Sequence, residues 1–198
     1  MKNKYIRTSI NEEIIDNYEL FNYSLKYALK GSAYHWKLSL LLIHILLQNI
    51  FVKSLHSKSC YAYMKLKPTK YQPHPEIWHE DNYSNKILNF MNLFKAVKKQ
   101  NNIGSRYDRL INKMHNEIRN RISHYDAKLH WSISIDLLIE MFRSSMEIVN
   151  LLIEKTNNIP MCRRDKARLM KAVKKYRKFC LGQHPLPLGE GEGHKRVG

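Results

Sequence analysis

Residues 38 to 52 read LSLLLIHILLQNIFV, a stretch that is apolar around almost its whole circumference when drawn as a helix. It spans 15 residues and contains His44, Gln48 and Asn49, which makes it short and polar for a membrane span of about 20 apolar residues. A helix that is apolar all round is typical of a helix surrounded by other helices. The sequence therefore predicts a buried central helix over 37–55, with His44 and the nearby His35 as satisfied core residues rather than ligands.

The segments on both sides of this helix show the apolar spacing of amphipathic helices. Residues 11–30 place Ile14, Tyr18, Phe21, Leu25 and Leu29 on one face, and Gly31 with Ser32 predicts a stop followed by a new cap. Further helices are predicted at 85–100, from Arg106 to about residue 119, at 129–156 and at 161–180, with a turn at 101–105. No useful strand alternation is present, so we expect an all-α bundle of five or six helices.

Two segments interrupt the helical pattern. Residues 56–84 contain Pro68, Pro73 and Pro75, which exclude a long helix and predict a long insertion after the second helix. Residues 181–198 are rich in Pro, Gly and Glu and are predicted to form a disordered tail. The expected organisation is a helical domain at 1–157 that includes the insertion, a basic C-terminal helix at 158–180, and the tail.

The charge of the chain is strongly basic, with 34 Lys and Arg against 17 Asp and Glu and a formal net charge of +17. Such a chain attracts polyanions, of which nucleic acid is the commonest and an anionic membrane surface the second. Composition does not choose between them, since Asn-, Ile- and Lys-rich chains also arise from AT-rich genomes.

The cysteines and the N-terminus indicate a reducing compartment. Cys60, Cys162 and Cys180 are odd in number and show no CxxC spacing, as expected for free thiols. The first residues, MKNKYIRTSINEE, lack the apolar core of a secretory signal. We therefore expect a cytoplasmic protein.

Residues 117–126 read EIRNRISHYD and place Arg119, Asn120 and His124 at the end of a predicted helix. On a regular helix Arg119 and His124 lie about 140° apart around the axis, so they share a cleft only if the helix ends or bends between them. A neutral histidine can take a proton from a ribose 2′-hydroxyl, while a guanidinium and an amide can bind the phosphate. These groups suffice for metal-independent RNA cleavage through a 2′,3′-cyclic phosphate. The alternative is a basic helix end with a partly exposed histidine.

The form Arg-Asn-x-x-x-His at residues 119–124 resembles the active-site motif of the HEPN superfamily. Its members are small all-α domains, many of them ribonucleases of toxin–antitoxin, phage-defence and CRISPR systems. The motif lies before a second long helix in a basic all-α chain, as in that family, and the apolar helix at 38–53 resembles the early core helix of HEPN domains. The resemblance covers about residues 37–156. It implies a HEPN-like bundle with His124 as acid or base and Arg119 and Asn120 as ligands of the scissile phosphate.

The resemblance also implies partners. HEPN domains commonly dimerise and combine two copies of the motif in one cleft, which implies a homodimer acting on RNA. It further implies a toxin or anti-phage effector with an antitoxin or another defence protein as partner. One HEPN group carries a tyrosine two residues after the histidine that a partner nucleotidyltransferase modifies. Here Tyr125 follows His124 directly, so that regulation is not implied, and we expect Arg121 and Tyr125 to contact the substrate.

Residues 163–178 read RRDKARLMKAVKKYRK, with nine basic residues and one acid. A charged run is usually a solvated helix face, but the acids that would balance such a face are missing here. We expect contacts with an RNA backbone, with Tyr176 as a stacking surface for a base. The residues predicted to bind are Arg163, Arg164, Lys174, Lys175 and Arg177.

No sequence motif indicates a metal or a cofactor. The patterns HExxH, GxGxxG, GxxxxGK[ST] and GxSxG are absent from the chain. The insertion contains potential metal ligands in an arrangement that fits no zinc spacing: Cys60, His74, His79, Glu80 and Asp81. Its aromatic residues are instead candidates for a substrate groove or a partner surface: Tyr61, Tyr63, Tyr71 and Trp78.

Two further functions compete with the ribonuclease hypothesis. A non-catalytic RNA-binding or protein-interaction module would use the same bundle without His124. A helical adaptor on anionic membranes would use residues 163–178, although we expect no membrane association.

Overall fold

The computed structural model describes residues 9–56, 88–119, 133–155 and 161–181, and within these ranges the chain is helical without any strand. The predicted all-α class is therefore confirmed for the described residues. Most of the predicted insertion, the motif from Asn120 onward and nearly all of the predicted tail lie outside these ranges. The side chains of residues 117–119, 155 and 179–181 also lie outside the description.

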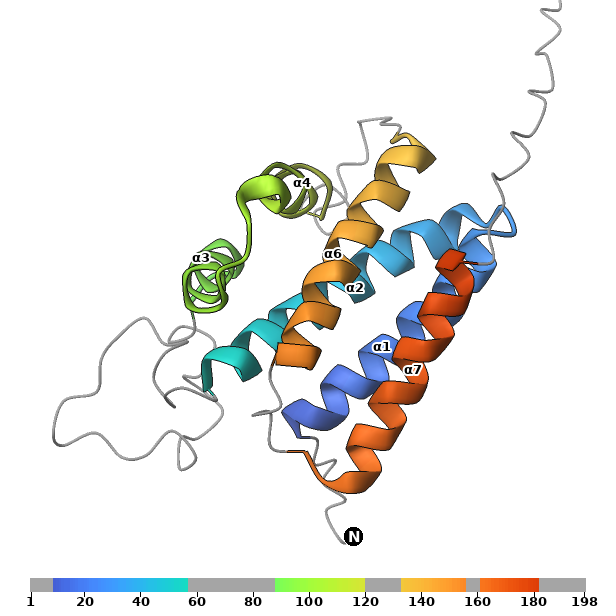
Figure 1. The fold of residues 1–198 in the computed structure, drawn as a ribbon. Coiled ribbons are helices and arrows are strands. Elements are labelled where there is room, and N and C mark those ends of the chain that lie inside the picture. Colours follow the sequence, from blue (N-terminus) through green and yellow to red (C-terminus); the bar gives the residue numbers. More distant parts are fainter. Residues whose placement is uncertain (1–8, 57–87, 120–132, 156–160, 182–198) are drawn as a thin grey trace, which may run out of the picture.

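The elements follow one another as helices of different lengths and types. They are α1 (Ile10–Ala28), α2 (Ala33–His56), α3 (Phe90–Asn101), the 3-10 helix η3 (Ser105–Tyr107), α4 (Asp108–Asn112), the π-helix η4 (Lys113–Arg119), α6 (Ile135–Lys155) and α7 (Arg163–Leu181). Figure 1 shows α1 and α2 as a hairpin, with α7 beside α1 and with α3 and α4 on the other side of the bundle.

The hairpin of α1 and α2 has well-defined ends. Ser9 and Glu12 form a capping box at the start of α1, in which the Ser9 amide donates to Glu12 Oε2 at 2.8 Å. The Glu12 amide donates back to Ser9 Oγ at 3.2 Å, so two otherwise unpaired donors are satisfied. Gly31 adopts a φ of +96°, which favours glycine and turns the chain into α2. The predicted stop at Gly31 and Ser32 is confirmed.

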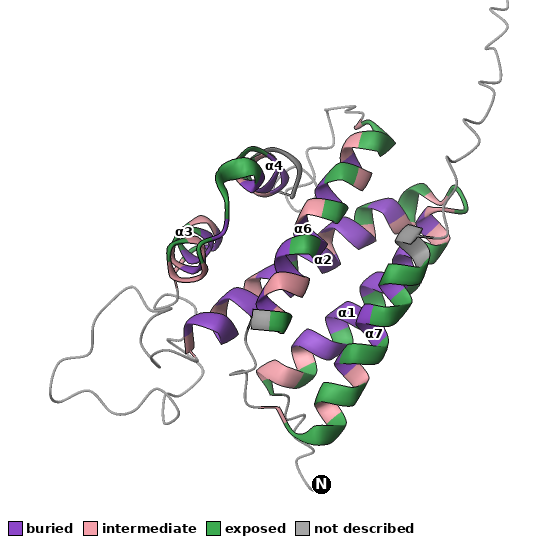
Figure 2. Cartoon of the chain, viewed as in Figure 1, coloured by how far each residue is buried: buried purple, intermediate pink, exposed green. Residues whose placement is uncertain are grey.

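Helix α2 is the centre of the bundle, as predicted. It packs against α1, α3 and α6, and its buried residues cover most of its circumference, while Ile45 lies on the side that stays exposed. Among the described helices it alone is long and apolar enough to cross a membrane, and 67% of its most apolar window is buried inside the bundle. Figure 2 shows this burial along α2 and exposure on the outer sides of α1 and α7.

Two helices begin later than predicted. The helix expected at 85–100 begins at Phe90, because the side chain of Asn89 accepts a hydrogen bond from the Asn92 amide at 2.9 Å and caps the helix there. The helix expected at 129–156 is described from Ile135, and residues 133 and 134 precede it in non-helical conformation. The turn at 101–105 is confirmed, with Asn102 in the left-handed region at φ 52°.

Helix α7 runs parallel to α1 and joins the common core (Figure 1). Its buried face consists of Leu169, Ala172, Val173 and Tyr176, which are spaced i, i+3, i+4 and i+7. The amide of Asn22 on α1 donates to the carbonyl oxygen of Ala172 at 3.0 Å, in a buried position. The basic helix is therefore packed on the bundle through its apolar side, and its charged side faces outward.

Candidate functional site

The predicted catalytic motif begins where the description of this part of the chain ends. Arg119 is the last residue of η4, and its side chain is not among those described. Asn120, Arg121, His124 and Tyr125 lie outside the described residues. The predicted cleft between Arg119 and His124 is therefore untested, but the structure describes the helical turns that lead into it.

These turns change their hydrogen-bonding type just before the motif. The helix passes from 3-10 geometry at Ser105–Tyr107 through α geometry at Asp108–Asn112 to a π-helix at Lys113–Arg119. A π-helix is wider than an α-helix and is found mostly as a short segment, frequently at functional sites. The sequence predicted a break between Arg119 and His124; the change of register already begins at Lys113.

A pair of histidines fixes this π-helix to the central helix. The Nε2 atom of His44 on α2 lies 2.8 Å from the Nδ1 atom of His115 on η4, at hydrogen-bonding distance. Phe90 at the start of α3 stacks on both rings, with centroid distances of 4.2 Å to His44 and 4.7 Å to His115. We call these three residues the histidine clamp. The expectation that His44 is a satisfied core residue is confirmed.

Met114, the residue before His115 on the π-helix, contacts a third helix, α6. Met114 is fully buried, and the Ser145 hydroxyl on α6 donates to its Sδ atom at 3.7 Å. The two residues that carry these contacts, Met114 and His115, are adjacent in the chain, so α2, α3 and α6 together fix the position of the π-helix that leads into the motif. Such support from packed neighbours is what a site needs if its groups are to be held in a fixed geometry.

The basic residues of α7 divide into two groups. Arg168 pairs with Asp16 at 3.0 Å and Glu19 at 2.8 Å on α1, and Arg177 pairs with Glu154 on α6 at 2.6 Å. The balancing acids that the sequence of this helix lacks are thus supplied by other helices for these two arginines. The remaining basic side chains are exposed and form no ion pair with a described residue: Arg163, Arg164, Lys166, Lys171, Lys174, Lys175 and Lys178.

The predicted binding residues of α7 are therefore only partly available. Arg163, Arg164, Lys174 and Lys175 are exposed as expected, whereas Arg177 is engaged with Glu154. The interpretation of Tyr176 as a stacking surface is wrong, because its ring is buried against Phe21 with centroids 6.1 Å apart. Tyr176 occupies the core position of the i, i+3, i+4, i+7 pattern and serves the packing of α7.

A group of aromatic residues at the α1–α2 turn was missed in the sequence. The rings of Tyr23 and Tyr27 lie 4.9 Å apart, Tyr27 stacks on His35 at 5.0 Å, and Tyr34 meets His35 edge-on at 5.3 Å. We call these four residues the tyrosine cluster. Tyr23 and Tyr34 are 54% and 68% exposed, so two rings of the cluster face solvent. The missed signal was the interleaving of Tyr, His and Lys in residues 23–37 without any acid.

The turn beneath the tyrosine cluster is held by a short chain of hydroxyl groups. The Ser39 hydroxyl donates to Ser24 Oγ at 3.0 Å, and the Ser24 hydroxyl donates to the carbonyl oxygen of His35 at 3.0 Å. The Ser32 hydroxyl lies 2.8 Å from His35 Nδ1. His35 therefore has fixed partners, as expected, but it is half-buried and not part of the fully buried core that was predicted.

Cations surround the same cluster. The ammonium groups of Lys26 and Lys30 each lie 5.9 Å from the centre of the Tyr27 ring, at the limit of a cation–π contact. The hydrogen bond with Tyr27 raises the pKa of Tyr23, so the phenol keeps its proton at neutral pH. The surface therefore combines neutral aromatic rings with positive charge.

Neither a metal site nor a relative was found. Within the described ranges, no three His, Cys, Asp or Glu residues lie close enough together to hold a metal ion. Comparison of the chain with protein-family models, with curated proteins and with solved structures gave no significant match.

Proposed function

We propose that this protein is a metal-independent endoribonuclease of the HEPN type, with His124 as acid or base and with Arg119 and Asn120 as ligands of the scissile phosphate. The observation that carries the proposal is the sequence Arg-Asn-x-x-x-His, which begins at the last residue of a π-helix that the histidine clamp holds to the core. A helix that changes register at this point favours a departure from regular geometry, which the motif requires if Arg119 and His124 are to meet.

The proposed reaction needs no water molecule or metal in its first step. The ribose 2′-hydroxyl loses its proton to a histidine and attacks the adjacent phosphorus, while the bond from phosphorus to the 5′-oxygen breaks. A second acid gives a proton to the leaving 5′-oxygen, so the products are a 2′,3′-cyclic phosphate and a 5′-hydroxyl end. Arg119 and Asn120 stabilise the charge that develops on the phosphate oxygens.

The proposal includes a homodimer and an RNA substrate. In a dimer the His124 residues of the two chains supply one base and one acid, which the balanced reaction above requires. The outward-facing basic residues of α7 are suited to contacts with the phosphate backbone. A cytoplasmic toxin or defence effector, controlled by a partner protein, is the biological role that this activity fits best.

The decisive experiment is cleavage of total RNA by the purified wild-type chain and by the variants His124→Ala and Arg119→Ala. We expect each variant to lose at least about a hundredfold in rate, because general acid–base catalysis contributes about 10² to 10⁴ and stabilisation of the phosphate charge about 10² to 10³. EDTA should leave the wild-type rate unchanged, and the products should carry 2′,3′-cyclic phosphate ends.

His130→Ala is a matched control, because it removes a nearby histidine that is not part of the motif. It should keep the activity of the wild type. Equal activity of His124→Ala and the wild type, or strict dependence on Mg²⁺, would remove the proposal.

A second function, a non-catalytic RNA-binding module, is favoured by one observation. Seven basic residues of α7 face outward without an ion pair to a described residue, and binding through them needs no catalytic group. This function predicts retarded but intact RNA on a gel, with equal retardation by the wild type and His124→Ala.

A further inference from the structure

The balance of acidic and basic residues on the face shared by α1 and α7 changes along the length of the two helices. Near the start of both helices, acids and bases alternate across the seam: Glu12 and Arg164 interact electrostatically, and Arg168 pairs with Asp16 and Glu19. Farther along, acids disappear from both helices. Residues 20–37 and 166–181 contain no Asp or Glu at all.

Helical register brings the exposed lysines of α7 to the level of the tyrosine cluster. Arg168 pairs with α1 at Asp16 and Glu19, and seven residues farther along each helix lie Lys175, Tyr23 and Lys26. Seven residues make two turns, or about 10 Å, so these residues occupy the same faces of their helices. The register is maintained between them, since Asn22 donates to Ala172 and Phe21 contacts Tyr176.

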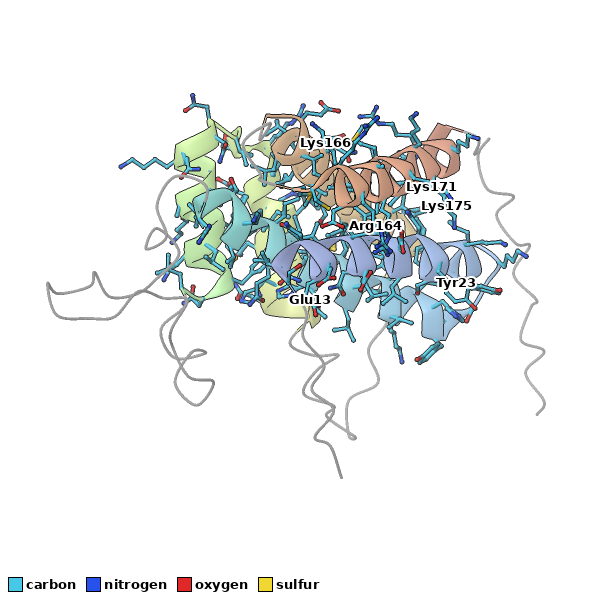
Figure 3. The ribbon with its side chains drawn as sticks, turned by 90° about the horizontal axis from the view of Figure 1, so that it is seen from below. Glu13, Tyr23, Arg164, Lys166, Lys171 and Lys175 are labelled. Carbon is cyan, nitrogen blue, oxygen red and sulfur yellow. The ribbon has the colours of Figure 1, made fainter. Side chains whose placement is uncertain are left out.

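Figure 3 looks onto this face. Lys171 and Lys175 extend from the side of α7 that borders α1, and Tyr23 lies toward the end of α1 that is nearest the turn. Lys166 points to the far side of α7. We call the exposed residues of this region the lysine–tyrosine face: Tyr23, Lys26, Lys30, Tyr34, Lys171 and Lys175.

We propose that the lysine–tyrosine face binds single-stranded nucleic acid, with bases stacking on Tyr23 and Tyr34 and phosphates contacting Lys171 and Lys175. Single-strand binding combines a positive surface for the backbone with aromatic rings for the bases, and both are present here. The identification of the strand as RNA rests on the function proposed above. In that case the face holds the substrate independently of its sequence.

An anionic membrane fits the same charges less well. A helix that lies on a membrane inserts an apolar face opposite its basic face. The apolar face of α7 is already buried in the bundle through Leu169, Val173 and Tyr176. Among the described side chains of α1 and α7, Leu20 and Met170 are the only exposed large apolar residues besides Tyr23, which is too few for such an insertion.

The first test measures binding of the full chain to a fluorescent 2′-O-methyl oligouridine, which lacks the attacking hydroxyl and so reports binding without cleavage. The double variant Tyr23→Ala/Tyr34→Ala should weaken binding at least about fivefold, since one stacked base already contributes that much. Tyr23→Phe/Tyr34→Phe keeps both rings and should bind like the wild type. Both tyrosines are largely exposed, so thermal unfolding of these variants should remain near that of the wild type.

The second test measures the salt dependence of binding. Lys171→Ala/Lys175→Ala removes two charges spaced i, i+4, and the slope of log K against log salt should decrease by about 1.4, or 0.7 for each lost phosphate contact. Lys95→Ala/Lys99→Ala removes two exposed lysines of the same spacing from α3 and should keep the slope. An equal effect of both pairs would mean that only net charge matters, and the proposal would be overturned.

Two controls separate this inference from other outcomes. Full RNA affinity of the tyrosine variant, together with lost sedimentation on phosphatidylserine vesicles, would overturn it in favour of a membrane. His124→Ala should bind the oligonucleotide like the wild type. If His124→Ala still cleaves RNA while the tyrosine variant loses binding, the proposed function fails and this inference stands.

Discussion

Inside the bundle, polar side chains find partners on other helices, whereas the cations of the lysine–tyrosine face do not. His44 meets His115 at 2.8 Å, Asn22 donates to Ala172 at 3.0 Å, and Ser39 donates to Ser24. On the surface, Lys171 and Lys175 form no ion pair with a described residue. A buried polar group without a partner costs stability, while an exposed ammonium is solvated by water and stays available to a ligand.

The comparison separates residues that hold the fold from residues that are free to bind. The interior pairs connect segments far apart in the chain, such as α2 with η4 and α1 with α7, and their loss should lower stability. Loss of the exposed lysines should leave stability unchanged and affect binding alone. One interior residue, Lys53, departs from this rule and provides a direct test of it.

The largest effect is expected at the histidine clamp. His44→Ala removes a ring that is 3% exposed and leaves a cavity beside Phe90, so the free energy of unfolding should decrease by about 3 kcal/mol. His44→Phe keeps the stacked ring but removes the hydrogen bond to His115, and should cost about 1 to 2 kcal/mol. Urea unfolding of both variants measures the two contributions. If His44→Ala were as stable as the wild type, the pairing inside the bundle would not matter for the fold.

The second effect concerns the buried Lys53, and here a substitution is expected to raise the free energy of unfolding instead of lowering it. Its side chain is buried in α2 with no ion pair or hydrogen bond to a described residue, and this burial lowers the pKa of its ammonium group. The unfolded chain therefore holds the proton more tightly than the folded protein does. Consequently stability should rise with pH as it passes through the lowered pKa toward the ordinary value of 10.5.

Lys53→Met replaces the buried ammonium by an apolar group of similar length. The variant should be about 1 kcal/mol more stable at pH 7, because no charge has to be desolvated. The difference from the wild type should narrow as the pH rises toward 10, since the wild type can then lose its proton. Lys95→Met, at an exposed position on α3, serves as the control and should show neither effect. A destabilised Lys53→Met would indicate that the ammonium group is favourably solvated where it lies.

The sequence predicted the helices well because their apolar residues recur at a fixed spacing. The central position of α2 followed from its apolar circumference, and the apolar face of α1 with Ile14, Tyr18 and Phe21 was also predicted correctly. The starts of α3 and α6 were wrong. Apolar spacing continues across a helix boundary, and only the hydrogen bond from Asn92 to the side chain of Asn89 shows where α3 begins.

The sequence analysis missed other features, some because they depend on contacts between distant residues and some although local spacing indicated them. The π-helix Lys113–Arg119 is held by His44, which lies 71 residues away from His115 in the chain. Tyr176 was misassigned although Leu169, Ala172 and Val173 precede it at core spacing, a pattern that could have predicted its burial. The tyrosine cluster follows from the i, i+4 spacing of Tyr23 and Tyr27 with the turn that brings His35 back onto Tyr27. Of the candidate catalytic residues, the structure places only the backbone of Arg119, the last described residue of η4, so the predicted break between Arg119 and His124 stays a prediction.

The smallest expected effect is a difference in stability between two variants, one in each half of the α1–α7 face. Arg168→Ala removes a side chain that bridges Asp16 and Glu19 in the charge-paired half, and should lower the free energy of unfolding by about 0.5 to 1 kcal/mol. This cost should shrink at 1 M salt, because the groups are exposed and the Debye length falls to about 3 Å. Lys175→Ala removes a cation that forms no ion pair with a described residue from the acid-free half, and should leave stability unchanged or slightly higher, since fewer like charges then repel one another.

Binding of 2′-O-methyl oligouridine should respond in the reverse order, with the larger loss for Lys175→Ala. Should Lys175→Ala instead lower stability as much as Arg168→Ala, Lys175 would be serving the fold, and the division between paired and available charge would not hold along this face.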